Sequence, residues 1–282
     1  MKVLTYAAAL AAAAVLAPVA ASSASSSPAT GTAAALPGVN MEATVKAAQI
    51  DPRRADDTRT PGAKSSVLLV EQALQAKHLL AAQWVDGYFG TTTVAAYAKY
   101  QKSLGYTGLD ASGLPGKTSL TKLGAGRFTV NHAIGPGARV ETGAVVINAR
   151  TKSMLAATEK ILGRTLTLSQ GSYNPGGDPS SAGTHDGGGV VDVSVSGMTP
   201  AYRVTVAKAL RTVGFAAWVR TPSQGDWPYH IHAAAISDTD LSSQAQHQTG
   251  DYYLGKNGLA NGAADDGPKV TPIRTWEEYQ RQ

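Results

Sequence analysis

The chain has 282 residues, 43% of them apolar, which is enough for one sizeable core or two small ones. It contains no cysteine, so disulfides and thiolate metal sites are excluded, and any zinc must be bound by His, Asp or Glu. The formal net charge of +5 favours contact with an anionic wall or membrane surface. The sequence contains no basic run and no interleaved aromatic platform, so it does not indicate binding to nucleic acid.

The first 63 residues divide into two segments that we expect to lie outside the folded domains. Lys2, an Ala-rich apolar run and the small residues up to Ala21 are typical of a secretory signal peptide over residues 1–21. An uncleaved anchor is the alternative, although the run is short for a membrane span of about 20 residues. Residues 22–63 are rich in Ser, Ala, Pro, Gly and Thr, which predicts a flexible linker. We therefore expect a secreted protein with no stable membrane insertion after cleavage.

Residues 64–125 show helical periodicity interrupted by turns. Apolar positions recur at helical spacing over 67–79 and 94–104, and a short third helix is expected at 118–123. The first turn reads Asp86-Gly87-Tyr88-Phe89-Gly90. This pattern resembles the three-helix peptidoglycan-binding module of wall hydrolases, which implies binding to peptidoglycan. A small helical domain that only packs on its neighbour is the alternative.

Strands that alternate with single helices predict an α+β domain over residues 140–260, with a small antiparallel sheet and surrounding helices. A polar, Gly-rich tail over 261–282 has no assigned fold. Gly163 fits the C-cap of one predicted helix. The expected helices are 154–162 and 200–212, and the expected strands are 127–130, 144–147, 166–168, 215–219 and 230–236.

One glycine-rich stretch organises the second domain. Gly183-Thr184-His185-Asp186-Gly187-Gly188-Gly189 leads into the apolar strand that carries Asp192. Close turns in such a loop can bring His185 and Asp192 toward one point. About forty residues later, strand alternation places His230 and His232 on one face. Imidazoles and a carboxylate suit zinc, which keeps one position open in catalytic sites.

His-x6-Asp followed by His-x-His resembles the LAS group of zinc metallopeptidases, over about residues 145–240. This group includes zinc D-alanyl-D-alanine carboxypeptidases and L-alanyl-D-glutamate endopeptidases. The resemblance implies zinc bound by His185, Asp192 and His232, with water in the fourth position. It implies that His230 assists proton transfer or steadies the oxyanion. The reaction would be hydrolysis of a stem-peptide bond of peptidoglycan, by a D,D-carboxypeptidase or an endopeptidase.

Two positions depart from the pattern of this group. Many members place Glu or Asp three residues before the last ligand as general base, where this chain has Tyr229. Asp226 lies nearby at a different spacing, and His230 is the other candidate for the base. Many members also carry a substrate-binding arginine in a Ser-Gly-Tyr-Arg loop, which here reads Gly171-Ser172-Tyr173-Asn174. A non-catalytic, monomeric wall protein with a structural or degenerate zinc site is therefore the alternative.

Overall fold

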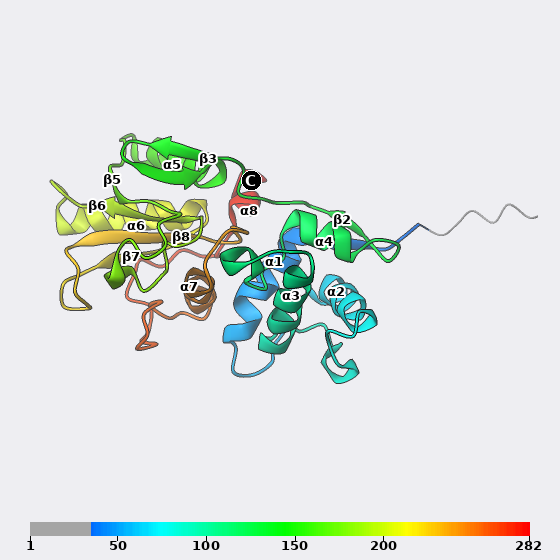
Figure 1. The fold of residues 1–282 in the computed structure, drawn as a ribbon. Helices are drawn as coiled ribbons and strands as arrows, with labels where there is room; N and C mark the ends of the chain where they lie inside the picture. The colour runs from blue at the N-terminus through cyan, green and yellow to red at the C-terminus, as the bar shows by residue number, and fades with distance from the viewer. Residues whose placement is uncertain (1–34) are drawn as a thin grey trace, which may run out of the picture. The chain divides into compact units, whose positions relative to one another are not determined.

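The structure, a computed structural model, describes residues 35–282 and contains helices and small sheets, which confirms the predicted α+β class (Figure 1). The predicted signal peptide and the first part of the predicted linker lie outside the described residues. Short 3₁₀ turns connect several elements, at Asp51–Arg53, Ala82–Trp84, Gly108–Ala111 and Pro179–Ser181.

Residues 36–131 form what we call the helical region. Its helices are α1 (Met41–Ile50), α2 (Lys64–Ala76), α3 (Thr91–Ser103) and α4 (Lys117–Leu123). β1 (Gly38–Asn40) and β2 (Thr129–Asn131) pair in parallel and bring the two ends of the region together. The three helices expected from periodicity are α2, α3 and α4.

The prediction of a flexible linker over residues 22–63 is wrong for residues 41–50, which form α1. The Asn40 side chain accepts a hydrogen bond from the Ala43 N–H at 3.1 Å and so caps the helix. Met41, Val45 and Ile50 are buried. The segment resembles a linker in composition because alanine is its commonest residue and it has few larger apolar residues.

The main sheet has the order β5-β6-β8-β7, and each pair of neighbours is antiparallel. Helices α5 and α6 cover one face, whereas α7 packs on the other, between the sheet and α1 (Figure 1). Gly163 ends α5 in the left-handed conformation, as expected for a C-cap. The strands are β5 (Leu168–Gln170), β6 (Val190–Ser194), β7 (Phe215–Arg220) and β8 (His230–Ala235), with a separate hairpin of β3 (Arg139–Thr142) and β4 (Val145–Asn148). The helices are α5 (Ala149–Leu162), α6 (Pro200–Val213), α7 (Ser243–Tyr253) and α8 (Trp276–Gln280).

Strand alternation gives the two faces of this sheet different chemistry. Val191, Val193 and Ile231 join the apolar cluster under α5 and α6. On the opposite face, Val190 and Ala234 pack into the core of the helical region, while Asp192 and the residues beyond it line a cleft. One face is therefore apolar at one end and polar at the other.

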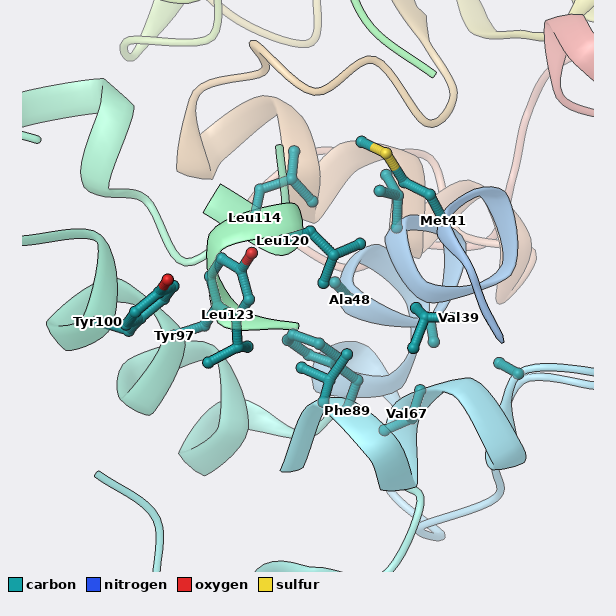
Figure 2. Packing of buried hydrophobic residues seen from close by; sticks show 14 of the residues in the cluster. Val39, Met41, Ala48, Val67, Phe89, Tyr97, Tyr100, Leu114, Leu120 and Leu123 are labelled. Carbon is teal, nitrogen blue, oxygen red and sulfur yellow. The ribbon is translucent and has the colours of Figure 1, made fainter. Parts of the chain in front are cut away.

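The helical region is not the separate domain that the sequence suggested, because residues Leu36–Gln282 form one compact unit. Its core is shared with Val190, Ala234, Leu241 and Ala245 of the second half. Figure 2 shows the helical side of this cluster, where Phe89 and Tyr97 pack among aliphatic side chains. Small residues on the sheet, above all Ala234, leave the space that the helices fill.

The C-terminal residues 261–282, whose fold was not predicted, contact both halves of the described chain. Asp265 accepts two hydrogen bonds from the Arg211 guanidinium, at 2.7 and 2.9 Å. On α8, Glu278 pairs with Lys46 of α1 at 3.0 Å. Arg281, which follows α8, pairs with Glu42 at 2.7 Å. The last element of the chain thus contacts the first helix.

Candidate metal centre and cleft

The glycine-rich loop packs closely enough against its neighbours to exclude side chains. A Cβ on Gly187 would lie 2.2 Å from the Asp240 carbonyl oxygen, and one on Gly171 would lie 2.6 Å from that of Val146. The Gly188 N–H donates to the Asp240 carbonyl at 2.8 Å, and Asn174 N–H to that of His185 at 3.0 Å. These contacts hold His185 in the loop that leads into β6, as the sequence pattern predicts.

The structure brings the three predicted ligands together. Their candidate donor atoms all lie within 4.8 Å of one another, and the three residues are buried. Asp192 Oδ1 lies 3.3 Å from His185 Nε2 and 2.9 Å from His232 Nδ1. Tetrahedral zinc with bonds of about 2.0–2.2 Å separates neighbouring ligand atoms by about 3.3 Å. The spacing of the donor atoms therefore fits such an ion.

In each of the two histidines, the hydrogen bond made by one ring nitrogen determines where the lone pair of the other nitrogen points. His185 Nδ1 donates to the Gly171 carbonyl at 2.7 Å, and His232 Nε2 donates to Gln248 Oε1 at 2.8 Å. In the neutral imidazoles, His185 Nε2 and His232 Nδ1 then carry lone pairs directed at Asp192. Three acceptors facing one another repel, so this arrangement requires a cation or extra protons between them.

The charges of the buried groups favour a metal ion over extra protons. Burial lowers the pKa of His232, and the nearby Asp192 only partly offsets that effect. Burial acts to raise the pKa of Asp192, but the adjoining His185 and His232 side chains outweigh it and hold the pKa well below its usual range. A carboxylate beside neutral imidazoles is the donor set that binds divalent metals. His185, Asp192 and His232 can therefore hold a metal ion.

A cleft of about 1230 Å³ opens over this group. His230 lies at its wall, with Nε2 3.8 Å from Asp192 Oδ2. Its Nδ1 donates to the Pro228 carbonyl at 2.8 Å, so the Nε2 lone pair of the neutral ring faces the cleft. The Trp227 ring packs edge-on against His230, with the ring centroids 6.3 Å apart. These contacts hold His230 beside the metal ligands.

The other predicted base, Asp226, is not brought to the site. It is exposed on the loop between β7 and β8 and, in the described part of the chain, is absent from the cleft lining. The bend at Trp227-Pro228 turns this loop so that Trp227 and Tyr229 face the cleft instead. Tyr229, in the position of the expected acidic residue, is 49% exposed, and Arg203 lies 4.7 Å from its ring centroid.

Several polar residues of the cleft were not predicted from the sequence. Gln248 orients His232, and it lies on α7 one turn after Gln244, which also lines the cleft. The spacing of these two glutamines, four residues apart as on one face of a helix, was an available signal. Asp178 lines the cleft from an exposed loop and accepts hydrogen bonds from Ser180. Arg220 enters from the end of β7, and no short motif marks it.

Comparison of the chain with protein-family models, curated proteins and solved structures finds no match. None of the helices within residues 35–282 has the length and apolar character needed to cross a membrane. The functional interpretation therefore depends on the geometry of the buried His-Asp-His group and its cleft.

Proposed function

We propose that the protein is a secreted, zinc-dependent peptidase that hydrolyses a stem-peptide bond of bacterial peptidoglycan. The observation that carries this proposal is the convergence of three buried lone pairs, from His185, Asp192 and His232, at the floor of an open cleft. Two imidazoles and one carboxylate, in a chain without cysteine, are the ligand set of catalytic zinc sites. A structural site would take a fourth protein ligand and close the centre.

When bound, zinc supplies a water whose pKa is lowered to about 7 and polarises the scissile carbonyl. The chain's own contribution is the placement of His230. The Nδ1–H of His230 donates to the Pro228 carbonyl, which leaves Nε2 as the acceptor. Nε2 can then take a proton from the attacking water and return it to the leaving amine. Gln248 keeps His232 in the tautomer that directs Nδ1 inward.

The substrate and location are supported by the sequence resemblances. The helical region resembles peptidoglycan-binding modules, and the ligand pattern resembles peptidases that act on the same polymer. Peptidoglycan carries many carboxylates, so a basic protein with a net charge of +5 is attracted to it. A leader typical of secreted proteins supports a location outside the cytoplasm, where this polymer lies.

The test measures bound zinc and the turnover of purified peptidoglycan by the protein, with His185→Ala alongside. We expect about one zinc per chain, and new amino groups or free D-alanine from the wild type alone. Stoichiometric zinc without hydrolysis would instead support a non-catalytic wall-binding protein. The absence of an acidic side chain at Tyr229 favours that second candidate. Failure to bind zinc would overturn both.

A further inference from the structure

Arg220 is a buried cation whose terminal nitrogens have no partner. It ends β7 opposite His230 in the register, so both side chains lie on the face of the sheet that carries the metal ligands. The residue is 2% exposed and lines the cleft. Within residues 35–282, its Nη1 and Nη2 atoms make no hydrogen bond. Its guanidinium carbon lies 4.8 Å from the Trp218 ring centroid, a contact that satisfies none of these N–H donors.

The other two arginines buried to a similar degree are both paired. Arg150 donates to the Glu277 carboxylate at 2.8 and 2.9 Å, and Arg211 donates to Asp265 at 2.7 and 2.9 Å. Burial of a guanidinium without an acceptor is strongly unfavourable, so folded proteins normally provide one. Burial also lowers the pKa of Arg220 to about 10, which leaves it charged near neutral pH. Two of the three buried arginines are thus paired with carboxylates, whereas Arg220, in the wall of the cleft, has no such partner among residues 35–282.

Other buried groups along the same cleft share this excess of donors. Trp227 Nε1 and Arg203 Nε, which also belong to cleft-lining residues, make no hydrogen bond to any described residue. A divalent metal bound beside the single negative charge of Asp192 would add positive charge at the floor. A ligand that pairs with the donors in this wall of the cleft must therefore supply hydrogen-bond acceptors and negative charge.

We propose that Arg220 binds the free carboxylate at the end of the peptide substrate, so that the cleft acts on the carboxyl end of the stem peptide. This inference builds on the proposed peptidase function. A carboxylate matches the two parallel N–H bonds that a guanidinium offers, whereas a neutral carbonyl would leave the buried charge uncompensated. Arg220 approaches from β7, the sheet edge opposite β5 and the Gly171–Asn174 loop that lacks an arginine.

The direct test compares two ligands that cannot be turned over, N-acetyl-D-alanine and N-acetyl-D-alanine amide. Calorimetry on the zinc-loaded protein should show at least about tenfold tighter binding of the carboxylate than of the amide. Arg220→Gln should reduce this preference to about twofold or less, and Arg220→Lys should retain part of it. Arg203→Gln removes the same charge from the same cleft and should reduce the preference much less than Arg220→Gln does. An unchanged preference in Arg220→Gln, or its equal loss in Arg203→Gln, would overturn the proposal.

A second readout separates ligand binding from a purely structural role. Arg220→Met removes an unpaired buried charge, so the melting temperature of the free protein should stay level or rise. Arg211→Met breaks a paired buried arginine and should lower it clearly. A decrease in Arg220→Met as large as that in Arg211→Met would show that Arg220 supports the fold and would overturn the proposal.

The subsite and the peptidase activity can fail separately. If carboxylate binding depends on Arg220 but the protein does not hydrolyse peptidoglycan, the proposed hydrolysis is overturned and the carboxylate-binding role of Arg220 is retained. If peptides with free and amidated carboxyl ends are hydrolysed at equal rates, and Arg220→Gln does not change this, the carboxylate-binding role of Arg220 is overturned and the peptidase activity is retained.

Discussion

The helical region and the cleft treat their buried polar groups in opposite ways. In the helical region, Asp51 accepts hydrogen bonds from the Thr60 N–H and hydroxyl and from the Phe89 N–H, at 2.6 to 3.1 Å. Glu71 accepts from the Asp86 and Gly87 N–H groups at 3.0 and 2.7 Å, and from the Thr93 hydroxyl at 3.0 Å. In the cleft, three acceptors face one another, and the terminal nitrogens of Arg220 meet no acceptor in the described part of the chain.

This contrast separates residues that build the fold from residues that await a ligand. The Asp86–Gly90 turn, the most specific part of the likeness to wall-binding modules, is held by Glu71 and Asp51 from inside the protein. Its backbone donors are thus already used. The unsatisfied groups of the cleft have no such internal partners among residues 35–282. Function is therefore best sought where hydrogen-bonding capacity remains unused.

The sharpest test of the contrast is Asp192→Asn. The variant removes the only charged member of the ligand group, so bound zinc should fall from about one per chain to none, and hydrolysis with it. Asp186→Asn changes a carboxylate in the same loop that is not one of the three ligands, and it should retain the metal. Elemental analysis after dialysis measures both. Full zinc occupancy in Asp192→Asn would show that the converging lone pairs are not a metal site.

A smaller effect is expected from Gln248→Leu. Loss of the acceptor for His232 Nε2–H frees the ring to rotate or change tautomer, which should weaken zinc binding about 10- to 100-fold. Gln244→Leu is the matched control, because it lies one turn earlier on α7 and also lines the cleft. Competition with a chelator gives the affinities. Similar affinities for the two variants would mean that Gln248 does not orient the ligand.

In the helical region, Glu71→Ala should affect stability and leave the metal untouched. It strands two backbone N–H groups and a threonine hydroxyl in the interior, which should lower the free energy of unfolding by about 3 kcal/mol. Glu71→Gln keeps an acceptor for the turn and should lose less. Urea denaturation measures the change, with zinc content determined in parallel. Loss of zinc in Glu71→Ala would show that the two regions are coupled.

A pH dependence of stability is also expected from Glu71. Burial raises the pKa of Glu71 from 4.5 to about 7, although hydrogen bonds from Gly87 and Thr93 oppose the shift. The folded state then holds a proton that the unfolded state releases between these two pH values. The stability due to Glu71 is complete below pH 4.5 and decreases as the pH rises toward 7. Subtracting the Glu71→Gln profile isolates this slope, and superimposable profiles would contradict it.

The sequence predicted the grouping of His185, Asp192 and His232 because local rules place these residues. Strand alternation puts His230 and His232 on one face, and glycines at close backbone contacts position His185. Arg220 and Gln248 could not be found in this way, since they reach the site through sheet register and the docking of α7. Asp226 was assigned by nearness in sequence alone, and the bend at Trp227-Pro228 turns it away from the cleft.

The domain organisation was less predictable than the site. Composition suggested a linker where α1 forms, because alanine is common to both. Periodicity identified α2, α3 and α4 but not the surface that they share with the sheet. That surface depends on Val190 and Ala234, which read as ordinary strand residues until the helices pack on them. Small residues at a tertiary contact carry no pattern of their own.

The contact between α1 and the C-terminal elements has a consequence for the timing of folding. Lys46 and Glu42 of α1 pair with Glu278 and Arg281, and Arg53 pairs with Asp251 of α7. These partners are separated by roughly two hundred residues or more, so these contacts form only after nearly the whole described chain has been synthesised. Because α7 also supplies Gln248, the centre matures at the same late step.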